Sequence, residues 1–137
     1  MSETYDLDLA RSVVRTERDA LDALEASLDA NIVEAARVIL ATDRHTIIAG
    51  VGKSGHIAQK IAASLASTGT PAFFLHPTEA SHGDLGMVTP GSVVIAISYS
   101  GESRELIDLL RFCRNTSVPI IAMTRAPMAS MSASVSM

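Results

Sequence analysis

The pattern of apolar and polar positions along the chain changes near residue 44. Before that point apolar residues recur every three to four positions, which predicts two helices, at residues 7–28 and 30–42. In the first helix the apolar positions share one stripe, while arginines and acids occupy the other faces. Such helices can pack on their own domain or on another subunit, and the pattern leaves both open. We therefore expect a helical segment at 1–43 ahead of a main domain at 44–137.

The main domain is predicted to be an α/β domain. Short apolar runs predict strands at 46–49, 72–75, 93–97 and 118–123, and helical patterns follow the first and the third of them. Because the runs are continuously apolar, we expect burial on both faces, which is typical of a parallel sheet. Alternation with helices then predicts a three-layer, open, doubly wound parallel sheet.

The tail at 126–137 is uncharged and rich in serine and methionine, and it predicts neither a helix nor a linker. An α/β unit normally continues with another helix and strand after such a point. We therefore expect the domain to be incomplete at its C-terminus.

Charge and composition narrow the class of function. The net charge of −4 argues against a general affinity for nucleic acid or anionic membranes. No apolar run approaches the roughly 18 residues that a membrane span needs, and the N-terminus lacks the features of a secretory signal. The single cysteine, Cys113, excludes an internal disulfide and fits a reducing compartment. These features predict a cytoplasmic protein without nucleic-acid or membrane partners.

A glycine-rich loop follows the first predicted strand. Residues 50–55 match G-x-G-x-x-G, but the ribose-binding acid of a dinucleotide site is missing about 20 residues later. A P-loop is excluded because Ile47 stands where its first glycine is required. What remains is a glycine loop at a helix start that offers backbone N–H groups, Lys53 and Ser54 to an anion. The alternative is that the glycines only permit a tight turn and Ser54 only caps the helix.

A serine-rich loop, residues 98–103, follows the third predicted strand. Its hydroxyls at Ser98, Ser100 and Ser103 can surround a phosphate, and the following helix favours the negative charge. Serine is also a common helix cap, so capping alone is the alternative. Because ligands of open α/β sheets bind beyond the carboxyl ends of the strands, we expect both loops to bind an anion there.

A third segment, residues 76–86, contains two histidines and two acids among hydroxyl and glycine positions. His76, Glu79 and His82 are the residue types that bind a divalent metal, but they match no standard ligand spacing. The favoured alternative is a polar loop whose histidines bind substrate hydroxyls or cap the backbone.

Together these stretches resemble one family. The glycine loop, residues 66–74, the His-Pro to Gly-Met segment at 76–87 and the serine loop are similar to the sugar isomerase (SIS) domain of arabinose-5-phosphate isomerases. The serine loop alone indicates the broad SIS superfamily, and the segment at 76–87 narrows the resemblance to this branch. The resemblance covers about residues 10–125.

The resemblance implies an isomerase that interconverts D-ribulose 5-phosphate and D-arabinose 5-phosphate, a Kdo precursor for lipopolysaccharide, as a homotetramer with no required cofactor. It implies catalytic roles for Lys53 and Glu105, and a zinc position at His76. It also implies substrate contacts, which fall on Gly69, Thr70, His76 and His82. A further glutamate and histidine of the family, and its paired CBS domains, would lie past Met137, which suggests a truncated form.

The isomerase chemistry needs a base for a carbon-bound proton, a proton carrier and positive charge for a cis-enediol intermediate. Glu105 is the candidate base or carrier, with Glu102 as a substitute, and Lys53 would hold negative charge. The alternative for Glu105 is an exposed acid that the helix dipole stabilises. Two other classes stay open: a non-catalytic sugar-phosphate-binding SIS module, and a dinucleotide-binding oxidoreductase, which Lys53 and the missing ribose acid disfavour.

Overall fold

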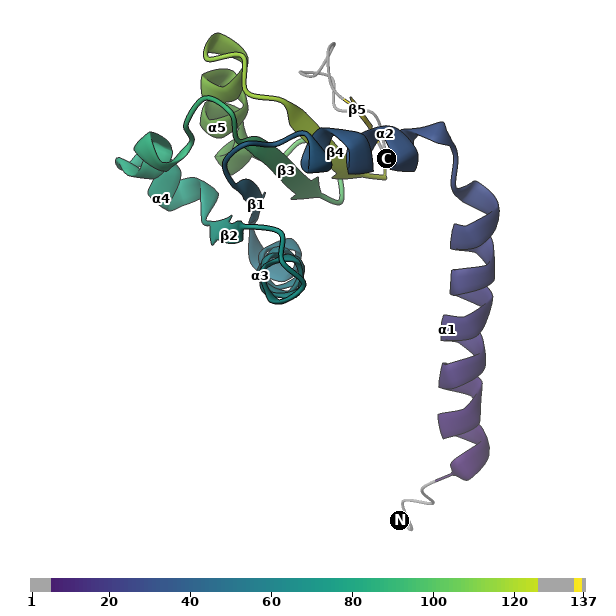
Figure 1. Ribbon diagram of the computed structural model, residues 1–137. Coiled ribbons are helices and arrows are strands. Elements are labelled where there is room, and N and C mark those ends of the chain that lie inside the picture. Colours follow the sequence, from purple (N-terminus) through teal and green to yellow (C-terminus); the bar gives the residue numbers. More distant parts are fainter. Residues whose placement is uncertain (1–5, 126–134, 137) are drawn as a thin grey trace. The chain divides into compact units, whose positions relative to one another are not determined.

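The computed structural model describes residues 6–125 and 135–136 (Figure 1). Over those residues no helix has both the length and the apolar character needed to cross a membrane. The elements in chain order are α1 (Leu7–Ser27), α2 (Ala30–Leu40), β1 (Thr46–Gly50), α3 (Gly52–Ser67), β2 (Ala72–Leu75), α4 (Pro77–Ser81), the 3-10 helix η1 (Asp84–Met87), β3 (Val93–Ser98), α5 (Arg104–Asn115), β4 (Ile120–Thr124) and β5 (Val135–Ser136).

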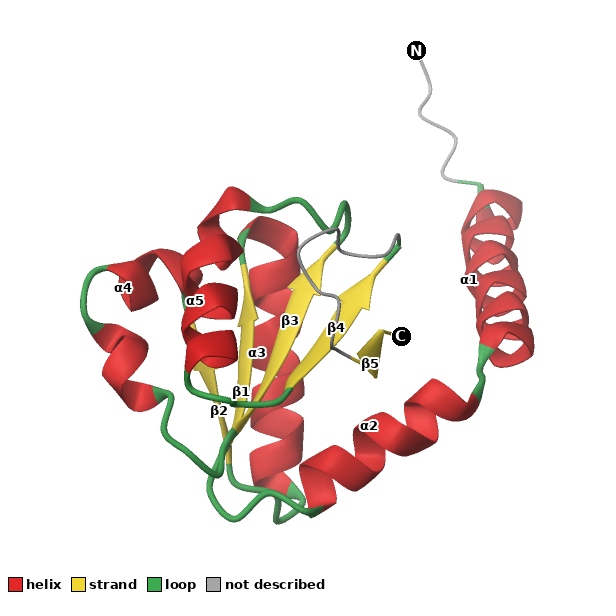
Figure 2. Ribbon diagram, turned by 90° about the horizontal axis from the view of Figure 1, so that it is seen from above, coloured by secondary structure: helices red, strands yellow, loops and turns green. Residues whose placement is uncertain are grey.

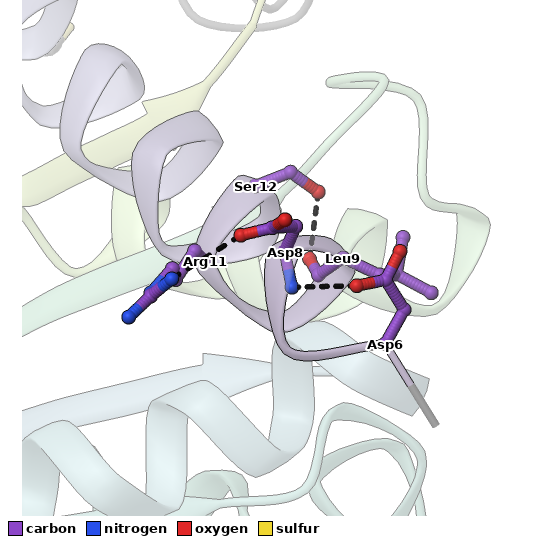
Figure 3. A network of polar contacts seen from close by, with 5 residues as sticks. All are labelled: Asp6, Asp8, Leu9, Arg11 and Ser12. Carbon is purple, nitrogen blue, oxygen red and sulfur yellow. Dashed lines mark hydrogen bonds and ion pairs between the residues drawn. The ribbon is translucent and has the colours of Figure 1, made fainter. Parts of the chain in front are cut away.

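The helix α1 belongs to a separate compact unit, Met1–Ala30. Its start is fixed by Asp6, whose carboxylate accepts a 2.8 Å hydrogen bond from the Asp8 N–H (Figure 3). Arg11, one turn after Asp8, donates a 3.2 Å hydrogen bond to the Asp8 carboxylate and forms an ion pair with it. The helix is amphipathic, yet none of its residues is buried. Its apolar stripe is therefore a surface of this unit.

The second unit, Asn31–Met137, is built on a parallel sheet with the strand order β2-β1-β3-β4-β5. The strand order reverses at β1, because the chain passes from β2 across β1 to reach β3. The predicted fold class, an α/β fold with an open, doubly wound parallel sheet, is confirmed. In such sheets the reversal creates a crevice beyond the carboxyl ends of the two central strands.

Helices cover both faces of the sheet (Figure 2). On one face, α2 and α3 bury Ala35, Ala58 and Ala62 against the sheet. On the other face, α4 and α5 bury a set that includes Leu106 and Leu109. Small residues on α2 and α3 allow these helices to approach the sheet closely, which explains a core almost without aromatic residues.

The structure divides the chain earlier than the boundary predicted after residue 43. The second unit begins at Asn31 because Ala35 of α2 is 2% exposed and packs with the sheet. The segment 76–86, expected to be a polar loop, contains α4 and the start of η1. The strand expected from Val118 begins at Ile120, because the Val118 N–H still bonds to the Cys113 carbonyl at the end of α5. The described part of the tail is β5, which pairs with β4. Residues 126–134 and 137 lie outside the described residues.

Candidate functional site

The glycine loop is shaped by close backbone contact. A Cβ atom added at Gly55 would lie 2.8 Å from the Gly50 carbonyl oxygen, and one added at Gly50 would lie 2.9 Å from the Ser54 carbonyl. Gly52 opens α3 with a φ of +57°, which favours glycine. The glycines therefore let the start of α3 touch the end of β1.

The start of α3 is not capped by a side chain of the described residues. Its N-cap is Val51, and Ser54 lies inside the helix, so the alternative that Ser54 only caps it is wrong. Lys53 is exposed and Ser54 is half-buried. The first N–H groups of a helix without a cap can donate to an anion.

The serine loop is shaped instead by its own hydroxyls. Ser98 is 2% exposed, and its Oγ lies 2.8 Å from Ser103 Oγ and accepts a 3.1 Å bond from the Gly101 N–H. Ser100 is exposed and accepts from the Glu102 N–H at 3.2 Å. Ser103 is the N-cap of α5, but its side chain makes no capping bond. Two of the three hydroxyls are thus engaged with each other, and Ser100 faces solvent.

Both loops leave the sheet at the same place. Gly50 at the end of β1 pairs with Ile97 of β3, so the glycine and serine loops begin on neighbouring strands at the point where strand order reverses. His76 follows β2 at the same edge, because Leu75 pairs with Ala49. Figure 2 shows α3 and α5 starting from this edge on opposite faces of the sheet. Residues of all three predicted motifs therefore meet at one sheet edge.

The helix α4 is in contact with α5. Ser81 Oγ donates to the Asp108 carboxylate at 3.2 Å, which ties the end of α4 to α5 one turn after Glu105. His82 ends α4 and is exposed, as is Glu105. His76 begins α4, and its Nδ1 accepts a 3.2 Å bond from the Thr78 N–H. The expectation that a histidine of this segment caps the backbone is confirmed at His76.

Gly69 and Thr70 lie elsewhere. They follow α3 and precede β2, and the adjoining Pro71 carbonyl accepts from the Thr46 N–H at the start of β1. This is the amino end of the strands, opposite to the loops described above. Within one chain the structure does not bring these two residues to Lys53, Ser100 and Glu105.

The described residues contain no group of three His, Cys, Asp or Glu side chains arranged to hold a metal. His76 keeps only Nε2 for a metal, since its Nδ1 is used in the cap of α4. Zinc at His76 stays a prediction, and no chemical step below depends on it. Cys113 is no candidate nucleophile, because burial raises the pKa of its thiol to about 12.

The sequence analysis missed one pair of residues at this edge, Tyr99 and Arg125. The Arg125 guanidinium donates to the Tyr99 hydroxyl at 2.9 Å and lies 5.6 Å from the centre of the Tyr99 ring. The signal was present in the sequence, because Tyr99 and Arg125 each come two residues after the end of a predicted strand. Residues at the carboxyl ends of neighbouring parallel strands are expected to meet.

An open parallel sheet with helix-starting loops at its point of strand reversal defines the class of α/β proteins that bind a ligand at that crevice. Comparison with known families places the chain within this class. The SIS domain matches residues 39–135, and the chain belongs to the SIS domain family.

Among curated proteins the chain is similar to the arabinose 5-phosphate isomerase KdsD of Pseudomonas aeruginosa, with 46% identity over 130 residues that cover 93% of this chain and 40% of that protein. KdsD of Francisella tularensis is 48% identical, with the same coverage. The chain thus spans 40% of the length of these relatives.

Two solved structures extend the comparison. An Escherichia coli CFT073 protein in complex with arabinose 5-phosphate matches with a TM-score of 0.80 and 38% identity, over 99% of this chain and 74% of that one. A putative sugar-phosphate isomerase from Listeria monocytogenes matches with a TM-score of 0.86 and 28% identity, over 95% and 69%.

Proposed function

We propose that this chain is the sugar-phosphate-binding part of an aldose-ketose isomerase that interconverts D-ribulose 5-phosphate and D-arabinose 5-phosphate. The observation that carries the proposal is the start of the glycine loop and the serine loop on adjacent strands, at the point where the strand order reverses. The similarity to two KdsD proteins and to a structure solved with arabinose 5-phosphate supports this choice of substrate.

In this proposal the two loops divide the binding of the sugar phosphate. The uncapped start of α3 supplies N–H groups, Lys53 supplies charge, and Ser54 and Ser100 supply hydroxyls. The Ser98–Ser103 pair acts differently, because Ser98 is buried and the two hydroxyls bond to each other. Its role is to hold the serine loop in shape, with Ser103 as the member that remains partly accessible.

The chemical step needs a group that moves a proton between two carbons. For D-ribulose 5-phosphate, a base takes a proton from C1, the O1 hydroxyl proton passes to O2, and C2 of the cis-enediol then receives a proton. Glu105 is the proposed base or proton carrier, since it is an exposed carboxylate in the first turn of α5. Lys53 would stabilise the negative charge of the enediolate, and His76 and His82 would bind sugar hydroxyls.

We further propose that the protein acts in the cytoplasm as a homo-oligomer, a tetramer by family resemblance. One observation favours assembly. The apolar side chains of α1 remain exposed, among them Leu21 and Leu24 at 64% and 54%. If Gly69 and Thr70 contact the substrate, they must do so from another copy, because they lie at the opposite edge of the sheet.

The alternative is a SIS module that binds a sugar phosphate without converting it. The solved NanR protein complexed with ManNAc-6P shares the fold, with a TM-score of 0.81 at 19% identity. Such a module would need the phosphate-binding loops but not Glu105. The separation of the two functions therefore depends on turnover and on this residue.

The test combines binding with turnover on the full chain. D-Arabinose 5-phosphate should raise the Tm and NAD should not, because the loops suit a phosphate but lack a ribose-binding acid. Conversion of D-ribulose 5-phosphate should fall by about 100-fold or more in Glu105→Gln, the range expected for loss of a general base. Glu79→Gln, on α4, is the matched control. Binding without turnover would favour the non-catalytic module, and no binding would refute both.

A further inference from the structure

Arg125 is held in one position by three contacts with Tyr99. Its backbone N–H donates to the Tyr99 carbonyl at 3.2 Å, and its Nη1 donates to the Tyr99 hydroxyl at 2.9 Å. The guanidinium carbon also lies 5.6 Å from the centre of the Tyr99 ring. The Arg125 side chain is exposed, and among the described residues it has no carboxylate partner.

The pair stands at the edge of the sheet where the two loops begin. Ser98 of β3 pairs with Thr124 of β4, so Tyr99 and Arg125 are the next residues on these neighbouring strands. The start of the serine loop therefore has Tyr99 within it and Arg125 beside it. Neither residue takes part in the chemical step proposed above.

The alternation of the strands indicates which face of the sheet the pair is on. Ile97 and Met123 pack with the cluster under α2 and α3. Tyr99 and Arg125 come two residues later, each one residue past the end of its strand, and a period of two continued by one residue would place them toward that face. This is also the face on which α3 begins with Lys53.

The charged residues at the carboxyl edge of the sheet indicate a function for Arg125. Glu105 lies in the first turn of α5, and Glu102 lies in the loop before it. Both are exposed. Among the described residues Arg125 forms no salt bridge, so its positive charge is not neutralised there. A guanidinium has five N–H donors in a planar fork, and the Tyr99 hydroxyl uses one donor group. The remaining donors suit a phosphate, which arginine binds in bidentate geometry.

We propose that Arg125, positioned by Tyr99, binds the phosphate group of the sugar phosphate from the β4 side of the site. Lys53 would approach the same group from the β1 side. The phosphate would then lie between two cations, one at each end of the crevice. Their positive charge would offset the negative charge of Glu102 and Glu105 at the start of α5. This inference rests on the proposed function. It adds a phosphate-binding residue that follows β4, besides the loops that follow β1 and β3.

The test is calorimetric titration of the full chain with D-arabinose 5-phosphate, and separately with inorganic phosphate. Arg125→Ala should weaken both affinities by about 10-fold or more, as expected for a lost charged hydrogen bond. Arg125→Lys should recover part of the loss, because it keeps the charge but not the fork. Tyr99→Phe should cause a smaller loss, since it removes the hydroxyl and keeps the ring.

The matched control is Arg44→Ala, which removes the same charge at the opposite edge of the sheet, just before β1. Its affinity should equal that of the original chain. An Arg125 that only ties β3 to β4 would lower the Tm of Arg125→Ala and leave both affinities unchanged, and that result would overturn the inference while the proposed function stands. Failure of the original chain to bind D-arabinose 5-phosphate would overturn both.

Discussion

The two loops at the carboxyl edge of the sheet reach a fixed shape by opposite means. In the glycine loop the shape comes from the backbone, because Gly50 and Gly55 approach so closely that neither can carry a Cβ. In the serine loop it comes from side chains, since Ser98 bonds to Ser103 and to the Gly101 N–H. The first loop leaves its polar side chains available, and the second uses most of its own.

This difference teaches that a count of hydroxyls overestimates the number of ligand donors. Ser98, Ser100 and Ser103 look equivalent in the sequence, yet only Ser100 is exposed. In contrast, the glycine loop contains one hydroxyl, but it also contains Lys53 and an uncapped helix start. We therefore expect ligand binding to depend more on the glycine loop, and the stability of the serine loop to depend on Ser98.

The largest expected effect is on the backbone contact of the glycine loop. Gly55→Ala should destabilise the chain by about 2–3 kcal/mol, because the new Cβ would overlap the Gly50 carbonyl oxygen and the backbone must move. Urea denaturation measures the change. Gly86→Ala is the control, since nothing lies within 4 Å of its Cβ, and equal losses in the two variants would contradict the close contact.

The second effect concerns the buried hydroxyl of the serine loop. Ser98→Ala should cost about 2 kcal/mol of unfolding free energy, because the buried Gly101 N–H loses its acceptor. Ser100→Ala should cost less than about 1 kcal/mol, since its hydroxyl is exposed. Thermal unfolding compares them, and a larger loss for Ser100→Ala would reverse the roles given to the two serines.

A third effect separates binding from stability in the glycine loop. Lys53→Ala should weaken binding of D-arabinose 5-phosphate by about 10-fold and leave the Tm unchanged, because Lys53 is an exposed cation without a described salt bridge. Calorimetry measures the affinity. Lys60→Ala, two turns further along α3, should bind normally, and the same loss in both variants would indicate a nonspecific charge effect.

The effect that is smallest at neutral pH concerns Cys113, in the last turn of α5. Burial raises the pKa of this thiol from 9.0 to about 12 in the folded chain. The folded state thus holds the proton more tightly than the unfolded state, and this contribution to stability is present below pH 9 and is lost as the pH rises toward 12. Cys113→Ala should lack that part of the decline in urea experiments between pH 8 and pH 11. A thiol reagent that labels the folded chain at pH 8 would contradict the burial.

The sequence was sufficient for the sheet and the position of both loops, because the apolar runs and the glycine spacing depend on local rules. It was not sufficient for α4, since five residues that begin with Pro77 are too few to show a helical period. Nor could it distinguish Ser98 from Ser100, because the direction of each hydroxyl depends on how α5 packs against the sheet. Gly69 and Thr70 show the limit of resemblance, because their distance from Lys53 depends on the topology of the whole unit.

The central claim is that the two loops hold one sugar phosphate together, and amide chemical shifts test it most directly. The full chain, labelled with ¹⁵N, is titrated with D-arabinose 5-phosphate. We predict that the amides of residues 52–54 and 98–103 shift together with a single dissociation constant. Shifts confined to one loop, or different constants for the two, would contradict the claim.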